Sequence, residues 1–197
     1  MKKMMMMLIM ATVALTASAQ NTLRDNGTFT LQPKIGIGIG ALSGEWKTYS
    51  GVDNKSRIGF VAGVEGEYYA NTWLGIAAGV NYAQQGWKFE GLGKEETTKL
   101  DYLNIPLTGN FYVAKGLALK TGVQFGFLMN GKLEDTDIKD ACEKLNLSIP
   151  IGVSYEISDF VIDFRYNLGL TKTNKEDNGN KVPRDLLQIT LGYKIPL

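Results

Sequence analysis

The chain has 197 residues, enough for one domain with a core, and its charge is nearly balanced, with 21 Lys and Arg against 20 Asp and Glu. This balance gives no argument for nucleic acid as a partner. The sequence has no histidine and a single cysteine, which excludes Ser-His-Asp chemistry, histidine-ligated metals and an intrachain disulfide framework. Glycine is unusually frequent, at 23 residues, against an average usage of about 7%.

The first 19 residues have the three parts of a secretory signal peptide. Lys2 and Lys3 are basic, the run 4–15 is apolar apart from Thr12, and Ala17-Ser18-Ala19 is a cleavage site of the A-x-A type. A membrane-anchoring helix is the alternative, but the run is short and ends in a cleavage site. We therefore expect a cleavable signal peptide and, because no long apolar window follows it, no transmembrane helix.

Apolar and polar residues alternate in eight later segments, which is the pattern of strands with two unlike faces. The clearest is Leu103 to Val113, where every odd position is apolar or glycine and the even positions are mostly polar. The expected strands are Leu31–Ala41, Arg57–Tyr69, Trp73–Ala83, Leu103–Val113, Leu117–Met129, Leu145–Glu156, Phe160–Leu170 and Leu186–Leu197. Their lengths are close to the roughly 9–11 residues that a tilted strand needs to cross a bilayer.

The connections between these segments alternate between long loops and short turns. The long loops are expected over residues 42–55, 86–98, 130–143 and 172–184, and the short turns at Ala70–Thr72, Ala114–Gly116 and Ser158–Asp159. In an up-and-down barrel this order puts all long loops at one end. The sequence therefore predicts an all-β fold, an eight-stranded antiparallel up-and-down transmembrane β-barrel over residues 31–197, after a signal peptide (1–19) and a polar lead-in (20–30).

A soluble barrel also alternates apolar and polar faces, so the period alone does not decide between water and membrane. Three features favour the membrane: small residues on the polar face, aromatic residues near strand ends, and an apolar face without mid-strand charges, where Lys or Arg would cost about 2–4 kcal/mol. Tyr69 and Tyr112 are grouped with the aromatics of the short-turn end. The expected interfacial aromatics are Tyr68, Trp73, Tyr82, Trp87, Phe111, Tyr155, Phe160 and Tyr193.

The polar face also carries charges of both signs, which should pair inside a closed lumen because an unpaired buried charge is strongly disfavoured. We therefore expect a plug of ion pairs in place of an open channel. The predicted lumen charge network is Lys34, Arg57, Glu65, Glu67, Lys120, Glu156, Asp163, Arg165 and Lys194.

The sequence as a whole resembles the PorT-like outer-membrane β-barrel proteins. The resemblance rests on Ala-Ser-Ala-Gln at 17–20, Lys-Ile-Gly-Ile-Gly at 34–38, Tyr-Leu-Asn-Ile-Pro-Leu at 102–107 and Leu-Gly-Tyr-Lys at 191–194. It implies an outer-membrane location and a barrel architecture, but most members have no assigned activity. The chain departs from the aromatic ending that is frequent in such barrels, because it ends in Leu197.

Four further features of the sequence are candidate sites. Gly36-x-Gly38-x-Gly40 lacks the spacing and the helix of a phosphate loop, and Glu65 with Glu67 fits ion pairing better than an acid pair for catalysis. The acidic loop around Asp135 lacks the spacing of a calcium loop, so a solvated loop is expected. Cys142 has no activating histidine and is expected to be a spectator. The sequence predicts no cofactor, no metal and no enzyme.

Three functions stay open at this stage. The leading one is an integral outer-membrane protein with a plugged lumen and a structural or surface-binding role through long extracellular loops, with membrane lipid and an envelope or surface protein as partners. The second is a component of an envelope protein-export or assembly system. The third is a secreted soluble β-barrel that binds an apolar ligand.

One residue of the fourth strand does not fit a regular barrel. Pro106 lacks a backbone donor, and a closed barrel has no edge strand in which that loss is harmless. We expect a local bulge or an unpaired carbonyl opposite Pro106, mirrored at Pro150 in the sixth strand.

Overall fold

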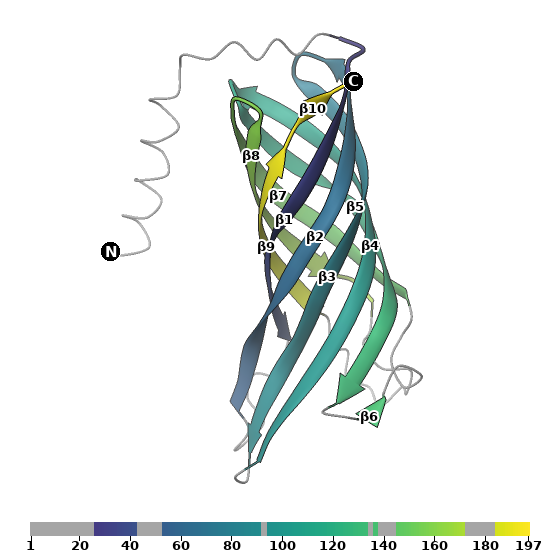
Figure 1. The fold of residues 1–197 in the computed structure, drawn as a ribbon, viewed down its shortest axis with the longest axis vertical. Coiled ribbons are helices and arrows are strands. Elements are labelled where there is room, and N and C mark those ends of the chain that lie inside the picture. The colour runs from purple at the N-terminus through teal and green to yellow at the C-terminus, as the bar shows by residue number, and fades with distance from the viewer. Residues whose placement is uncertain (1–25, 43–52, 92–93, 134–135, 138–144, 172–183) are drawn as a thin grey trace, which may run out of the picture.

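The computed structural model describes residues 26–42, 53–91, 94–133, 136–137, 145–171 and 184–197 (Figure 1). The predicted signal peptide and most of the lead-in lie outside these residues. Eight long strands and two short ones, β6 (Thr136–Asp137) and β10 (Ile195–Pro196), form one antiparallel sheet. The long strands are β1 Phe29–Leu42, β2 Asp53–Asn71, β3 Leu74–Gly91, β4 Lys94–Ala114, β5 Leu117–Leu133, β7 Leu145–Ile157, β8 Phe160–Gly169 and β9 Arg184–Tyr193.

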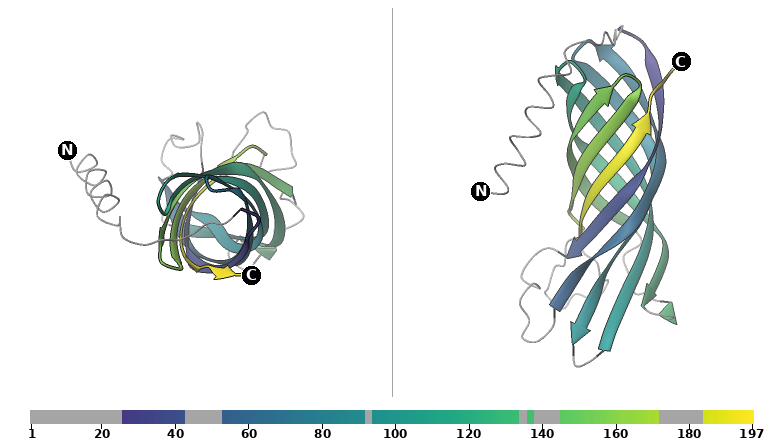
Figure 2. Two further views of the ribbon diagram at one scale, coloured as in Figure 1. Left: turned by 90° about the horizontal axis from the view of Figure 1, so that it is seen from above. Right: turned by 60° about the vertical axis from the view of Figure 1, so that its left-hand side comes forward.

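The sheet closes on itself and confirms the predicted barrel. Each long strand pairs with the next one along the chain, and β1 pairs with β9 from Lys34↔Gly192 to Leu42↔Arg184. The view down the barrel in Figure 2 shows the closed ring. Closure leaves no free edge through the body of the barrel, so the backbone donors and acceptors of β1 and β9 bond to each other.

The three short turns lie where the sequence predicts them, at the end of the barrel that also holds the C-terminus (Figure 1). In the β2–β3 turn the Asn71 side-chain oxygen accepts hydrogen bonds from the backbone N–H groups of Trp73 (3.0 Å) and Leu74 (2.8 Å). In the β4–β5 turn Gly116 has a φ of 76°, in the left-handed region that glycine adopts without strain. We call this the short-turn end.

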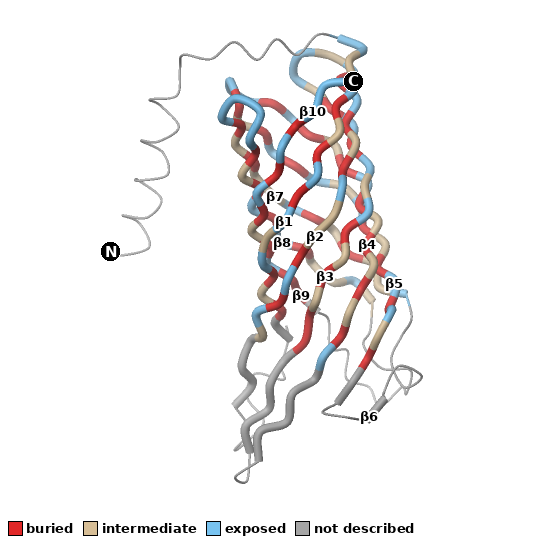
Figure 3. The backbone as a smooth tube through the Cα atoms, in the orientation of Figure 1, coloured by how far each residue is buried: buried red, intermediate tan, exposed pale blue. Residues whose placement is uncertain are grey.

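The faces of the strands are reversed relative to a soluble protein. Where the structure describes burial, buried residues alternate with half-buried or exposed ones along the long strands, as Figure 3 shows. The exposed positions are apolar, as in Ile35 and Ile37 of β1 or Ile76 and Val80 of β3, whereas most of the residues buried in the lumen are polar or charged. An apolar exterior around a polar interior is the arrangement that a bilayer selects.

Strands β2 to β5 extend well beyond the predicted bounds and project past the rest of the barrel (Figures 1 and 2). The predicted long loop over 86–98 is wrong, because β3 and β4 stay paired up to Gly91↔Lys94. The charged residues of this segment suggested a loop, but strands that leave the membrane no longer need an apolar face. One register shift in β2–β3, between Ser56 and Val61, and one in β4–β5, between Asp101 and Tyr102, lie where the projecting sheet begins, as bulges often do at barrel rims. Each of these two ladders has a second shift beside its short turn.

Several lumen glycines are required by the close approach of the neighbouring strand. A Cβ atom on Gly122 would lie 2.0 Å from the Leu107 carbonyl oxygen and 2.8 Å from the Thr108 Cα. One on Gly36 would lie 2.0 Å from the carbonyl oxygen of Ile189. These contacts are with backbone, which cannot rotate away, so the glycines permit the tight coiling of a small barrel.

The strand prolines interrupt the sheet without shifting its register. The β3–β4 ladder omits the pairs that Pro106 and Ile105 would make, and the β5–β7 ladder omits those of Pro150 and Ile149, while the pairs on either side keep the same register. Of the two expected alternatives, the bulge does not form, and the ladder is instead interrupted opposite both prolines. On their other sides, Pro106 and Pro150 remain in unbroken ladders, Pro106↔Gln124 and Pro150↔Asn167.

The close approach at Gly122 yields a test of the fold. We expect Gly122→Ala to lower the stability of the folded barrel by about 1–3 kcal/mol or more, because the added methyl group overpacks against backbone. Gly109→Ala is the matched control, because a Cβ there lies 3.4 Å from the ring of Phe111, an ordinary contact. The measurement is the fraction of purified protein that migrates as a folded barrel on unheated gels after urea titration. Equal midpoints for the two variants would contradict the account.

Candidate functional site

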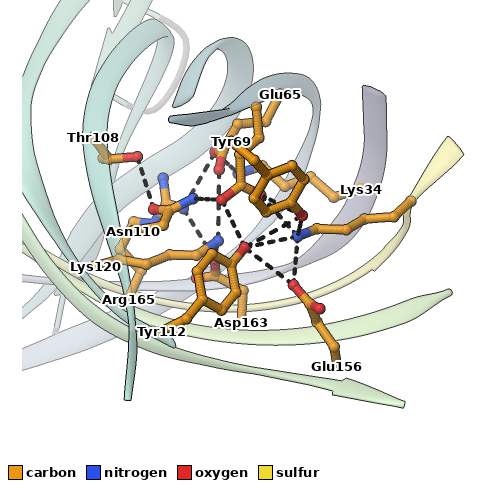
Figure 4. Close-up of polar contacts among 12 residues, drawn as sticks. Lys34, Glu65, Tyr69, Thr108, Asn110, Tyr112, Lys120, Glu156, Asp163 and Arg165 are labelled. Atoms are coloured by element: carbon orange, nitrogen blue, oxygen red, sulfur yellow. Dashed lines mark hydrogen bonds and ion pairs between the residues drawn. The ribbon is translucent and has the colours of Figure 1, made fainter. Parts of the chain in front are cut away.

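The charged residues of the lumen gather in two clusters (Figure 4). The central cluster consists of Lys34, Glu65, Lys120, Asp163 and Arg165, from strands β1, β2, β5 and β8. Arg165 Nη2 lies 2.9 Å from Asp163 Oδ2 and 3.2 Å from Glu65 Oε2. Lys34 Nζ lies 2.6 Å from Glu65 Oε2, and Lys120 Nζ lies 2.8 Å from Asp163 Oδ2. Because Glu65 and Arg165 sit on β2 and β8, their contact ties together strands that are not neighbours in the sheet.

The second cluster lies nearer the short-turn end and is built around Lys194. Its ammonium group lies 2.7 Å from Glu67 Oε2 and also pairs with Glu156. Lys194 Nζ donates to the hydroxyl oxygens of Tyr69 (2.6 Å) and Tyr112 (2.9 Å). The Tyr112 hydroxyl group in turn donates to Glu67 Oε1 at 2.6 Å. We call this group the short-turn cluster.

Asn110 connects β4 to the short-turn cluster. Its side-chain Nδ2 donates to Glu67 Oε1 at 2.8 Å, and its Oδ1 accepts from the Thr108 hydroxyl group at 3.3 Å. All three side chains are buried. Glu67 is thus held by partners from β4 and from the C-terminal segment, at positions far apart in the sequence.

The charges of the two clusters compensate each other. The central cluster has three cations and two carboxylates, and the short-turn cluster has one cation and two carboxylates. Burying a charge is costly unless it is paired and hydrogen-bonded, and breaking such a pair costs about 3–5 kcal/mol. These contacts therefore specify how opposite walls of the barrel sit, even where they add little to net stability.

Sequence reasoning misplaced two tyrosines and one arginine. Tyr69 and Tyr112, grouped by the sequence analysis with the aromatics at the membrane surface, are buried in the lumen. Tyr69 lies an even number of residues from Glu65 and Glu67 on β2, and Tyr112 an even number from Thr108 and Asn110 on β4, so alternation alone pointed both side chains inward. Arg57 lies apart from both clusters and donates to the Gln85 carbonyl oxygen at 2.8 Å.

The outward aromatics occur where the alternation predicts them. Trp73 stacks on Phe111 with ring centroids 6.3 Å apart, and Phe160 meets Tyr193 edge-on at 5.2 Å. Tyr68 is also exposed. These residues adjoin the short turns, as an interfacial girdle would. Of the remaining predicted aromatics, Tyr82 and Tyr155 are half-buried, and the Trp87 side chain lies outside the described part of the structure.

Over the residues that the structure describes, there is no group of three or more Cys, Asp or Glu side chains arranged to hold a metal ion. The predictions for Asp135 and Cys142 concern residues outside the described part of the structure. Nor does the described part contain a helix long and apolar enough to cross a membrane.

A family model described as the outer membrane protein beta-barrel domain matches residues 18–175 of the sequence. The chain belongs to this family. No curated protein matches the sequence. The family and the apolar exterior together place this barrel in the outer membrane and argue against the third candidate, a secreted soluble β-barrel that binds an apolar ligand.

Solved outer-membrane barrels share the fold at low sequence identity. Ail, the attachment invasion locus protein of Yersinia pestis, is 18% identical with a TM-score of 0.52, over 87% of this chain and 100% of Ail. It has also been solved in complex with the heparin analogue sucrose octasulfate. Neisserial surface protein A is 17% identical with a TM-score of 0.51, over 85% of this chain and 97% of its own. OprG of Pseudomonas aeruginosa is 11% identical with a TM-score of 0.51, over 86% of this chain and 96% of its own.

The central cluster predicts a large penalty for losing one cation. We expect Lys120→Met to lower the free energy of unfolding by about 3–5 kcal/mol, because it leaves Asp163 buried with one partner fewer. Lys115→Met is the matched control: Lys115 is an exposed residue of the β4–β5 turn, and its replacement should change stability by no more than about 0.5 kcal/mol.

The measurement is urea unfolding of both variants in lipid vesicles, followed by tryptophan fluorescence. A Lys120→Met barrel as stable as Lys115→Met would show that the central cluster does not hold the lumen together.

Proposed function

We propose that this family member is a closed outer-membrane barrel that does not conduct ions and acts through the surface formed by its long connections. The observation that carries the proposal is the contact of Arg165 on β8 with Glu65 on β2, which crosses the lumen. Strands β2 and β8 are not adjacent in the sheet, so the two side chains meet inside the ring.

The burial of the charged groups supports a closed lumen. Arg165 is 1% exposed and Lys120 3% exposed, and even Glu156 and Lys194, nearer the end of the barrel, are only 8% exposed. Charged side chains that line a water-filled pore would be exposed to the solvent in it. The polar interior here instead supplies its own counter-charges, which is how a narrow eight-stranded barrel fills its lumen.

The projecting sheet supports a role at the cell surface. Outer-membrane barrels carry their longer connections outside the cell and their short turns in the periplasm. With this orientation, β2 to β5 rise above the membrane as a continuous sheet. A paired sheet of this kind offers a surface for contact with another surface or molecule, and Ail, a protein of the same fold named for attachment and invasion, offers a precedent.

We infer that the chain is not an enzyme, since it has no histidine and the carboxylates of the two lumen clusters are occupied by Lys and Arg partners. Within the family we assign it to the PorT-like barrels, on the Tyr-Leu-Asn-Ile-Pro-Leu element at 102–107. That assignment keeps a role in protein export or assembly as the second candidate. A stoichiometric protein partner that co-purifies from detergent-extracted envelopes would favour it over a surface role.

The closed lumen is tested by recordings in planar lipid bilayers. We expect the purified wild-type barrel to give no large, stable conductance. A triple variant, Lys34→Ala with Glu65→Ala and Arg165→Ala, removes the long side chains that cross the lumen and should raise the frequency of conducting events. Heat-dependent gel mobility serves as the control that the variant is folded. Stable conductance from the wild-type protein would refute the proposal.

A further inference from the structure

A second polar layer in the lumen is not part of either ion-pair cluster. Asn81, Asn104, Gln124, Asn167 and Gln188 are all buried, with exposed fractions of 1–4%. We call these five residues the amide layer. Asn81 pairs directly with Asn104 across β3 and β4, so that their side chains share the lumen face.

The amide layer lies between the central cluster and an apolar row. On β8, Arg165 is the next lumen-facing residue after Asn167 toward the short-turn end. On β2, Glu65 is the next one after Gly63, the residue paired with Asn81. Toward the projecting sheet, the next lumen-facing residues are apolar: Val61 pairs with Ala83, Ala83 with Tyr102, and Tyr102 with Leu128. All four are buried. Charges thus close one side of the amide layer and apolar side chains close the other.

Most of the amide layer's hydrogen-bonding capacity is not met by protein groups. Within the described residues, both side-chain atoms of Asn104 lack a partner, as do Asn81 Oδ1, Gln124 Oε1, Asn167 Oδ1 and Gln188 Nε2. Arg165 Nη1, on the charged side, also lacks one. A buried polar atom left unpaired is costly, and native structures pair nearly all of them with protein or with ordered water.

The chemistry of these atoms selects the ligand. Three are donors, on Asn104, Gln188 and Arg165, and four are acceptors, on Asn81, Asn104, Gln124 and Asn167. An anion would satisfy only the donors and a cation only the acceptors. Water donates and accepts, and a buried water typically makes about three hydrogen bonds to such groups.

Glycines paired with the amides favour this ligand as well. Asn104 is paired with Gly126, Asn81 with Gly63, and Gln188 with Gly38. A Cβ atom on Gly126 would lie 2.7 Å from Asn104 Oδ1, so the amide leans over bare backbone toward the wall. It therefore reaches less far across the lumen than the long Lys and Arg side chains do.

We propose that the amide layer is a binding site for a cluster of ordered water molecules, enclosed between the central cluster and the apolar row. The waters bridge Asn104 to Gln188 and to Arg165 Nη1, and they complete the hydrogen bonds of the lumen. The site is internal, so its waters exchange slowly with the solvent. The slow exchange rests on the closed lumen proposed above, whereas the presence of the waters does not.

Asn110 provides an internal control for the experiment. It is a buried asparagine on the same strand as Asn104, but its Nδ2 already donates to Glu67 and its Oδ1 accepts from Thr108. The experiment is NMR of the full barrel in lipid nanodiscs, recording transfer of magnetisation from water to side-chain amide protons. We expect cross-peaks from long-lived water at Asn104 and Gln188 and none, or much weaker ones, at Asn110.

A substitution tests whether the waters form one cluster. Asn104→Leu keeps the side chain's size but removes both of its polar atoms, so the water cross-peaks at Gln188 should weaken severalfold. Asn110→Leu, a matched change outside the layer, should leave them intact. Heat-dependent gel mobility again establishes that both variants fold.

The outcomes separate this proposal from the proposed function. A barrel that does not conduct and shows no water cross-peaks at Asn104 and Gln188 would refute the water site while leaving the closed lumen in place. Conductance together with exchange at the rate of bulk solvent would refute both proposals. Anomalous scattering from bromide at the amide layer in a soaked crystal would show that the site takes an anion, which would also overturn the proposal.

Discussion

The structure depends on one constraint, which is that a backbone in hydrocarbon has no water to bond and must satisfy its own N–H and C=O groups. The pairing of β1 with β9 meets that constraint by closing the sheet. Closure of only eight strands then fixes a narrow lumen, so that half of the strand residues face a crowded interior and half face lipid. The apolar exterior, the glycines at strand contacts and the compact polar interior all follow from that geometry.

The lumen residues become less polar from the short-turn end toward the projecting sheet. The short-turn cluster and the central cluster neutralise each other's charge, and the amide layer separates the central cluster from an apolar row near the projecting sheet. Buried ion pairs contribute specificity more dependably than net stability. In this barrel the Glu65–Arg165 and Lys120–Asp163 contacts join strands that the sheet does not pair, so they restrain the relative positions of walls that no backbone hydrogen bonds connect directly.

The sequence determines the strands and their faces because lipid and lumen impose opposite chemistry on alternate residues. In β4, alternation alone placed Asn104, Thr108 and Asn110 inside. Alternation also implied that Tyr112 points inward, but the sequence analysis grouped it with the aromatic girdle because it lies near a strand end. Eight of the nine predicted lumen charges lie in the two clusters, and Arg57 does not, since it bonds to a backbone carbonyl near the projecting sheet.

Other features were beyond sequence reasoning for physical reasons. Strand pairing above the membrane needs no apolar face, so nothing in the charged segment 86–98 distinguished a hairpin from a loop. Choosing which carboxylate meets which cation depends on the stagger of the strands, which a single sequence does not reveal. The break in the ladder opposite Pro106 could be predicted from its missing N–H donor. That the pairs on either side keep the same register could not be predicted from the sequence.

The central claim is that charge pairs crossing the lumen hold opposite walls of this outer-membrane barrel in place. The most direct measurement is a double-mutant cycle between Glu65 and Arg165, with Glu65→Gln, Arg165→Met and the double variant unfolded in lipid vesicles. The account predicts a favourable coupling energy toward the upper part of the range of about 0.5–3 kcal/mol that residues in contact show. Strictly additive effects of the two substitutions would contradict it.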